Sequence, residues 1–274
     1  MDIVLESATS IVLSDNNLEH LKETYDEYLE YLYKLSTLDS RILTSFLSTL
    51  KDREIINNQE TENEDIFLME FYRIHQAIDS ISVAMESFKD DYIDKDELKY
   101  LHGIVIKGSS DDIPENYDFR SDDNKWVGSF NIDGTKNIDY MPPSHTQISS
   151  LLDKTLAILN DKIGDEVLDN PLIKPFIVHA LIAYIQPFGN GNTRLSRLVQ
   201  HGKIWTMSNK ESGIVMPMPT LYLSKNYRQT RGQYRDLIRY LATTRDWNSW
   251  FNYNLNMIDE QLFFCSNNLQ KIRR

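Results

Sequence analysis

The sequence predicts an all-α protein with one short β-hairpin, and three observations support this fold class. Apolar residues recur at helical spacing along most of the 274-residue chain. One aromatic and β-branched segment, residues 125–132, runs into Asp133-Gly134, a favoured pair for a tight hairpin turn. Only 10 glycines and 8 prolines are present, so the composition does not suggest disorder. We therefore expect a helical bundle that carries a single hairpin.

The N-terminal residues predict a helical extension of a larger domain. Between Leu18 and about Leu50, apolar residues alternate with charged ones at helical spacing, which predicts two amphipathic helices. The polar stretch 57–64 has no periodicity and predicts a loop. This loop would separate an extension at 1–56 from a domain at 65–274. A helical pattern resumes at Phe67, Phe71, Ile74, Ile78 and Ile81, and again from Leu98 to His102.

The remaining helices follow from capping signals and apolar stripes. Ser144 and Gln147 have capping-box spacing and precede an apolar stripe from Ile148 to Ile163. Asn170-Pro171 predicts an N-cap and a first helical residue, followed by an unbroken helical pattern to Ile185. Further helices are expected at 194–207, 227–243 and from Trp247 into the C-terminal region.

Composition and charge exclude several classes of function. The net charge of -12 argues against a duplex nucleic-acid partner, which would require a cluster of Lys and Arg. Cys265 is the single cysteine, so an internal disulfide and a Cys-based zinc site are both excluded. No apolar run approaches bilayer-spanning length, and the first residues do not resemble a signal peptide. We expect a cytoplasmic protein with neither a nucleic-acid nor a membrane partner.

The segment 186–197, QPFGNGNTRLSR, is the candidate site. A glycine- and asparagine-rich turn that leads into a helix leaves backbone N–H groups free to hold an anion. Gly191 would let the backbone approach a phosphate, and Arg194 and Arg197, three residues apart, would share one helix face. These features indicate either a phosphate cradle or a plain helix connector with two solvated arginines.

This segment resembles the signature of the Fic family, His-Pro-Phe-x-(Asp/Glu)-Gly-Asn-Gly-Arg-x-x-Arg. Six positions match in register: Pro187, Phe188, Gly191, Asn192, Arg194 and Arg197. His179 also stands seven residues before Gln186, as a family histidine does before the signature histidine. Upstream, 119–120, 126–128 and 142–143 resemble the family's target-binding flap, in which Val127, Gly128 and Ser129 are the candidate contacts. Downstream, 223–224, Arg231 and Tyr234 resemble the helix that closes over the nucleotide. The resemblance spans about residues 98–262.

The resemblance implies a fold, a ligand and an activity. Fic domains are helical bundles with a β-hairpin flap, and they transfer AMP from ATP to a Ser, Thr or Tyr hydroxyl of a target protein. The signature histidine is the general base, but here it is Gln186, which cannot take up a proton. The acidic Mg²⁺ ligand is here Asn190, a neutral and weaker oxygen donor. Thr193 replaces the second glycine of the signature.

What survives is the part of the signature that binds phosphate. Gly191, Asn192, Arg194, Arg197 and Tyr234 are expected to hold ATP or another nucleotide, with Mg²⁺ at Asn190 as a weak candidate. We expect a Fic-type protein that binds a nucleotide or phosphate-containing ligand with weak or lost AMP transfer. An active transferase and a non-catalytic interaction module that uses the flap for an unknown partner protein remain alternatives.

Two further expectations concern regulation and rescue of catalysis. Fic proteins are often inhibited by a helix with the pattern (Ser/Thr)-x-x-x-Glu-(Gly/Asn), and Glu54 is the candidate for its glutamate. Leu50 and Ile55 depart from that pattern, so a surface role for Glu54 is favoured. His179 lies on a core helix and is expected to be structural, and a role for His201 near the nucleotide is the less favoured of its two interpretations.

Overall fold

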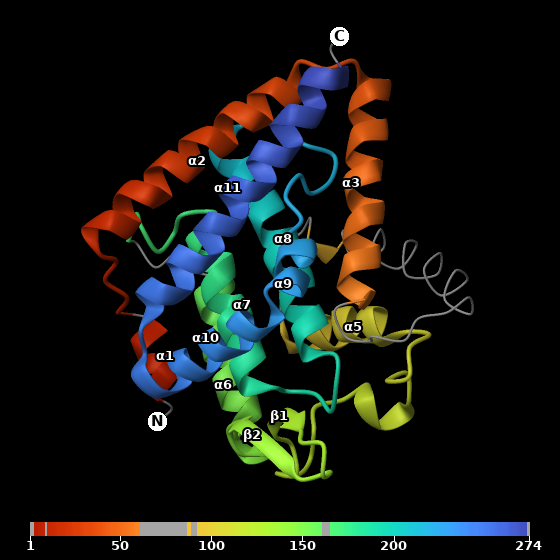
Figure 1. Ribbon diagram of the computed structural model, residues 1–274, viewed down its shortest axis with the longest axis vertical. Coiled ribbons are helices and arrows are strands. Elements are labelled where there is room, and N and C mark those ends of the chain that lie inside the picture. Colours follow the sequence, from red (N-terminus) through yellow and green to blue (C-terminus); the bar gives the residue numbers. More distant parts are fainter. Residues whose placement is uncertain (1–2, 9, 61–86, 89–91, 161–164, 273–274) are drawn as a thin grey trace.

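The protein is helical with one two-stranded sheet, which confirms the predicted fold class (Figure 1). The computed structural model describes residues 3–8, 10–60, 87–88, 92–160 and 165–272, but not the side chains of residues 3, 5, 6 and 54–60. Its longer helices are α2 (Asp15–Ser36), α3 (Ser40–Glu60), α5 (Lys95–Ile106), α6 (Ile148–Asn160), α7 (Ile173–Ile185), α8 (Asn192–Ser212), α10 (Arg231–Thr244) and α11 (Trp247–Ile272). Short helices are α1 (Ile3–Ala8), α9 (Ser224–Gln229) and the 3-10 turns at Pro114–Asn116 and His145–Gln147. Within these described ranges, no helix has both the length and the apolar character needed to cross a membrane.

Helices α7 and α8 form the centre of the bundle (Figure 1). The sequence of α7, IKPFIVHALIAYI, is apolar on all sides, as expected of a helix enclosed by others. Helices α6, α10 and α11 pack around it. Trp250 of α11 is fully buried and donates its indole N–H to the carbonyl of Phe176 at 2.9 Å. The loop between α7 and α8 is therefore supported by a rigid core.

The two predicted N-terminal helices are present as α2 and α3. Ser14 caps α2 by accepting a hydrogen bond from the backbone N–H of Asn17. Helix α2 packs along α11, and α3 contacts α9 (Figure 1). Tyr28 of α2 also bonds Thr220 at 2.9 Å in the buried core. The extension thus shares one hydrophobic core with the rest of the chain, and the predicted domain boundaries stay a prediction.

Three predicted elements differ from those of the structure. The predicted loop 57–64 is helical at least to Glu60, because Gln and Glu are good helix formers even without an apolar stripe. Residues 61–64 and the predicted helical pattern at Phe67–Ile81 lie outside the described residues. Helix α7 begins at Ile173 rather than after Asn170, whose side chain instead accepts a hydrogen bond from the N–H of Leu172 in a preceding turn. The predicted helix 227–243 is divided between α9 and α10.

The predicted hairpin consists of β1 (Val127–Phe130) and β2 (Lys136–Tyr140), paired antiparallel around a turn at Gly134. The register shifts between Val127 and Gly128, where a side chain at residue 128 would collide with the carbonyl of Asn137. The backbone N–H of Arg120 donates to Pro187 O and its side chain to Gln186 O, both at 2.9 Å. These bonds attach the segment before the hairpin to the α7–α8 loop.

Candidate active site

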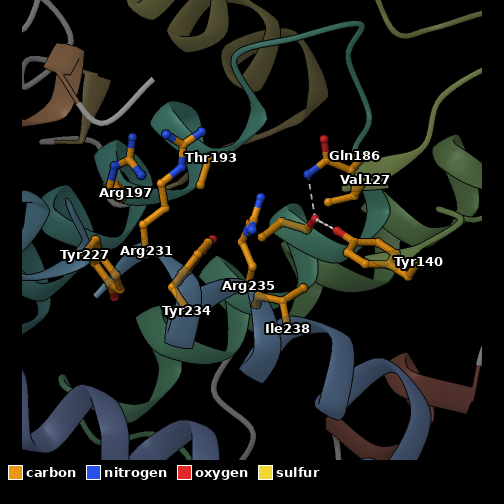
Figure 2. A pocket seen from close by; sticks show the side chains of 11 residues that line it. Val127, Tyr140, Gln186, Thr193, Arg197, Tyr227, Arg231, Tyr234, Arg235 and Ile238 are labelled. Atoms are coloured by element: carbon orange, nitrogen blue, oxygen red, sulfur yellow. Dashed lines mark hydrogen bonds between the residues drawn. The ribbon is translucent and has the colours of Figure 1, made fainter. Parts of the chain in front are cut away.

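The α7–α8 loop is a tight turn bounded by two residues in the left-handed conformation. Gln186 ends α7 at φ 49° and ψ 59°, and Gly191 caps α8 at φ 75°. A non-glycine residue is costly in this region and persists only when its surroundings hold it there. The amide of Gln186 donates to Ala183 O at 2.7 Å (Figure 2). It also accepts a hydrogen bond from Asn192 at 3.1 Å. Its side chain is therefore engaged in stabilising the turn.

Asn192 closes this loop with its side chain. Its Oδ1 accepts from the backbone N–H of Phe188, and its Nδ2 donates to Phe188 O, both at 2.9 Å. The same Nδ2 donates to Gln186 Oε1. Asn192 is only 2% exposed and does not line the pocket described below. The structure thus gives it a role in shaping the loop, in contrast to the expected contact with a phosphate.

Gly191 is required at the start of α8 because the chain passes close to α5. A Cβ atom at this position would lie 2.7 Å from Ile106 Cγ2 and 2.9 Å from His102 Nε2. The positive φ adds a second penalty for any larger residue. Gly191 therefore permits close packing of the loop against α5. The sequence had suggested only that it lets the backbone approach a phosphate.

The two signature arginines have different environments. Arg194 is 3% exposed, donates to Val105 O at 3.2 Å and forms an ion pair with Asp111. Arg197 instead lines a pocket that Arg194 does not line (Figure 2). The expectation that both arginines face one phosphate is wrong for Arg194, because its guanidinium is directed to the carboxylate of Asp111.

The pocket beside the loop is a cavity of about 100 Å³ between α7, α8, α10 and the hairpin. Figure 2 shows Arg197 of α8 with Arg231 and Arg235 of α10 around it. The remaining residues are neutral: Val127, Tyr140, Ala183, Gln186, Thr193, Tyr227, Tyr234 and Ile238. No carboxylate is among these lining residues. The lining is suited to an anion.

The predicted site residues are only partly brought together in this pocket. Gln186, Arg197, Tyr234 and Val127 line it, together with Thr193. Gly128 and Ser129 lie in β1 but do not line it. Glu54 lies in α3, and its side chain lies outside the described residues. The expectation for Glu54 stays a prediction.

The pocket lining also includes residues that the sequence analysis did not predict as site residues: Arg235, Tyr140, Tyr227 and Ile238. Residues 231, 234, 235 and 238 of α10 follow the spacing of one helix face. That spacing could have grouped Arg235 with Arg231 and Tyr234. Tyr140 and Tyr227 carried no comparable signal, because the fold brings them to the pocket from separate elements.

Behind the pocket lies His179, which is fully buried. Its ring bonds Gln200 through Nδ1 and lies 3.0 Å from the Tyr234 hydroxyl through Nε2. Burial lowers the pKa of His179 to about 3, so the ring is neutral at pH 7. His201 accepts a hydrogen bond from the backbone N–H of Leu223 at 3.0 Å and does not line the pocket. Both histidines are engaged in the core, in keeping with the structural roles expected for them.

No general base for neutral pH lines the pocket within the described part of the chain. Gln186 has no titratable group, and burial raises the pKa of the Tyr140 and Tyr227 hydroxyls well above 10. The Tyr140 hydroxyl also donates to Ala183 O at 2.5 Å (Figure 2). The arrangement can hold an anion but does not offer a group that removes a proton from a hydroxyl.

Comparison with known proteins agrees with this fold. Residues 92–201 match the model of the Fic/DOC family. The matched segment contains the loop and Arg197.

Three solved structures share the fold. A Fic family protein from Desulfovibrio desulfuricans G20 is 17% identical, with a TM-score of 0.68. The match covers 94% of this chain and 76% of that chain. Fic-1 from C. elegans, residues 134–508, is 15% identical, with a TM-score of 0.67 and coverage of 93% and 73%. A Fic domain containing signaling protein from Bacteroides thetaiotaomicron VPI-5482 is 14% identical, with a TM-score of 0.60 and coverage of 92% and 97%. At these identities the similarity establishes the fold alone.

Replacing Gly191 by alanine should destabilise the protein more than the same change at Gly213. Both glycines cap α8 ends at positive φ, but a Cβ at residue 213 meets nothing within 4 Å. We expect Gly191→Ala to lower the free energy of unfolding by about 1–3 kcal/mol more than Gly213→Ala. Urea unfolding of the two variants measures this, and equal losses would contradict the close packing against α5.

Stability should fall as the pH drops below 6.5. His102 donates from Nε2 to Asn190 O at 2.8 Å, and its Nδ1 is buried with no partner among the described residues. Burial lowers the pKa of His102 to about 4, so between pH 6.5 and 4 the unfolded chain binds the proton that the folded chain does not.

The variant His102→Gln separates this contribution from that of other groups. Its free energy of unfolding should decline less between pH 6.5 and 5 than that of the native protein, by up to about 1.4 kcal/mol per pH unit. Urea unfolding at several pH values provides the comparison. Parallel pH profiles would show that His102 is not buried in its neutral form.

Proposed function

We propose that this protein binds a nucleotide or another phosphate-bearing ligand in the pocket of Arg197, Arg231 and Arg235, with weak or lost AMP transfer. The observation that carries the proposal is the convergence of three guanidinium groups on one cavity whose lining contains no carboxylate. Guanidinium groups form strong, often bidentate hydrogen bonds with phosphate oxygens. Arg231 is exposed and Arg235 half-buried, so a ligand can reach the cavity from solvent.

The size of the cavity supports binding of phosphates rather than enclosure of a whole nucleotide. Its volume of about 100 Å³ is well below the roughly 300 Å³ at which sites for drug-sized ligands begin. The phosphates of a nucleotide would therefore lie among the arginines, and the nucleoside would extend toward the open side.

The same residues are the reason for proposing that AMP transfer is weak or lost. Gln186 holds the turn through Ala183 and Asn192, and it has no proton-accepting group near pH 7. Loss of a general base costs on the order of 10²–10⁴-fold in rate. His179 is separated from the cavity by Tyr234, which lines it.

Alanine substitutions on α10 test the binding site with a matched control. Arg231→Ala and Arg235→Ala should each weaken ADP binding about tenfold or more, since a hydrogen bond to a charged group contributes about 1.5–3 kcal/mol. Arg239→Ala removes the same charge from the same helix but outside the pocket lining. It should leave the affinity within about twofold of the native value.

Isothermal titration with ATP, ADP and AMP gives these affinities. The proposal fails if none of the three binds, or if Arg239→Ala weakens binding as much as the pocket variants do.

An active transferase is the alternative that labelling excludes or establishes. Incubation with ATP labelled on the α-phosphate and a cell lysate should transfer no more label with the native protein than with Arg197→Ala. Label that appears with the native protein and disappears with Arg197→Ala would establish transfer at this pocket. It would require a proton acceptor other than Gln186.

The hairpin is a second candidate surface, for a target or partner protein. Phe130 is 66% exposed, and Ile132 at the turn is fully exposed. Strands β1 and β2 pair only with each other among the described residues, so an extended peptide could add to an edge. A photo-crosslinker placed at Ile132 tests this candidate. If the hairpin binds a partner protein, crosslinks formed by the native hairpin should disappear in the variant Phe130→Asp. Crosslinks that persist in this variant would count against the candidate.

A further inference from the structure

The loop that would hold a divalent metal is already in contact with a positively charged group of the protein itself. The Lys125 ammonium donates to Gly189 O at 2.6 Å and to Asn190 Oδ1 at 3.3 Å. Asn190 is the residue that occupies the family's metal-ligand position. Lys125 comes from the segment before the hairpin, 65 residues earlier in the chain.

The residues present do not fit Mg²⁺. This ion prefers carboxylate oxygens and phosphates, whereas Asn190 offers one neutral carbonyl that accepts from the ammonium. In the described part of the chain, no group of three or more His, Cys, Asp or Glu side chains could hold a metal. A divalent cation at Asn190 would also lie beside a fixed positive charge and be repelled by it.

The loop is held in this arrangement from both sides. His102 donates to Asn190 O at 2.8 Å and stacks on Phe188 with ring centroids 3.7 Å apart. A Cβ at Gly189 would collide with the side chain of Asn116, so the loop also packs closely on that side. The contacts with Lys125 therefore belong to a rigid turn and are not those of a free chain segment.

We infer that the Lys125 ammonium takes the place of the divalent metal at this loop, and that the pocket accepts its phosphate-bearing ligand as a metal-free anion. The second part rests on the proposed function. The positive charges would then be supplied entirely by the protein, with Lys125 on the loop and Arg197, Arg231 and Arg235 in the cavity. A neutral amide stands where the signature has an acid, and the chain places a lysine beside it.

Titration of the native protein with ADP tests whether the ligand binds with or without a divalent metal. With EDTA present, ADP should bind at least as tightly as with excess Mg²⁺, because Mg²⁺ would chelate the phosphates that the arginines bind. Binding that is tenfold or more tighter with Mg²⁺ would overturn the inference. Absence of binding under both conditions would overturn the proposed function, and the metal measurement below would then decide the role of Lys125 by itself.

Binding of Mn²⁺, followed by electron paramagnetic resonance without nucleotide, tests the metal site directly. The native protein should retain no Mn²⁺ at the concentration of the protein. The variant Lys125→Met with Asn190→Asp should bind Mn²⁺ measurably more tightly than the native protein, although one carboxylate makes only a weak site. The matched variant Lys136→Met with Asn190→Asp, in which Lys125 remains, should bind none.

Retention of Mn²⁺ by the native protein would overturn the inference whatever the variants do. If both double variants are folded by circular dichroism and bind Mn²⁺ equally, or if neither binds it, Lys125 is not the group that excludes the metal. If Lys125→Met with Asn190→Asp fails to fold, the Mn²⁺ and ADP measurements on the native protein decide whether the inference holds.

Discussion

The side chain of Asn192 holds the turn on which the candidate site depends. It bonds both backbone groups of Phe188 and the side chain of Gln186, so it ties the start of α8 to the left-handed end of α7. That turn sets the direction of α8 and places Arg197 and Thr193 at the cavity. It also places Asn190 within reach of Lys125 and His102. The hydrogen bonds of the loop therefore stabilise the turn, and the turn positions the residues that line the pocket.

The substitutions in the signature can be understood as changes of role. Gln186 stands where a base would act, but its amide stabilises the turn. Asn190 stands where a metal would bind, but its carbonyl accepts from an ammonium group. Arg197 keeps its place at the cavity and is joined by two arginines of α10. Binding of phosphate groups is therefore better supported by the residues than removal of a proton.

Helical periodicity predicted most of the fold, because buried stripes and capping residues are local in sequence. The start of α7 and the end of α3 were misplaced, since a turn after Asn170 and a polar helical segment carry no such stripe. Within the site, the signature located Arg197 but not the partner of Arg194. Asp111 is 83 residues away in sequence, and only the tertiary packing of its loop against α8 reveals the ion pair. The contact of Lys125 with the loop is equally non-local.

The central claim is that the protein holds phosphates among three arginines and leaves them intact. A crystal structure of the native protein grown with ATP and without divalent metal tests it most directly. The account predicts an unbroken triphosphate in contact with Arg197, Arg231 and Arg235, with Lys125 still on the loop. ATP bound elsewhere with this cavity free of it, or AMP covalently attached to the protein, would contradict the account.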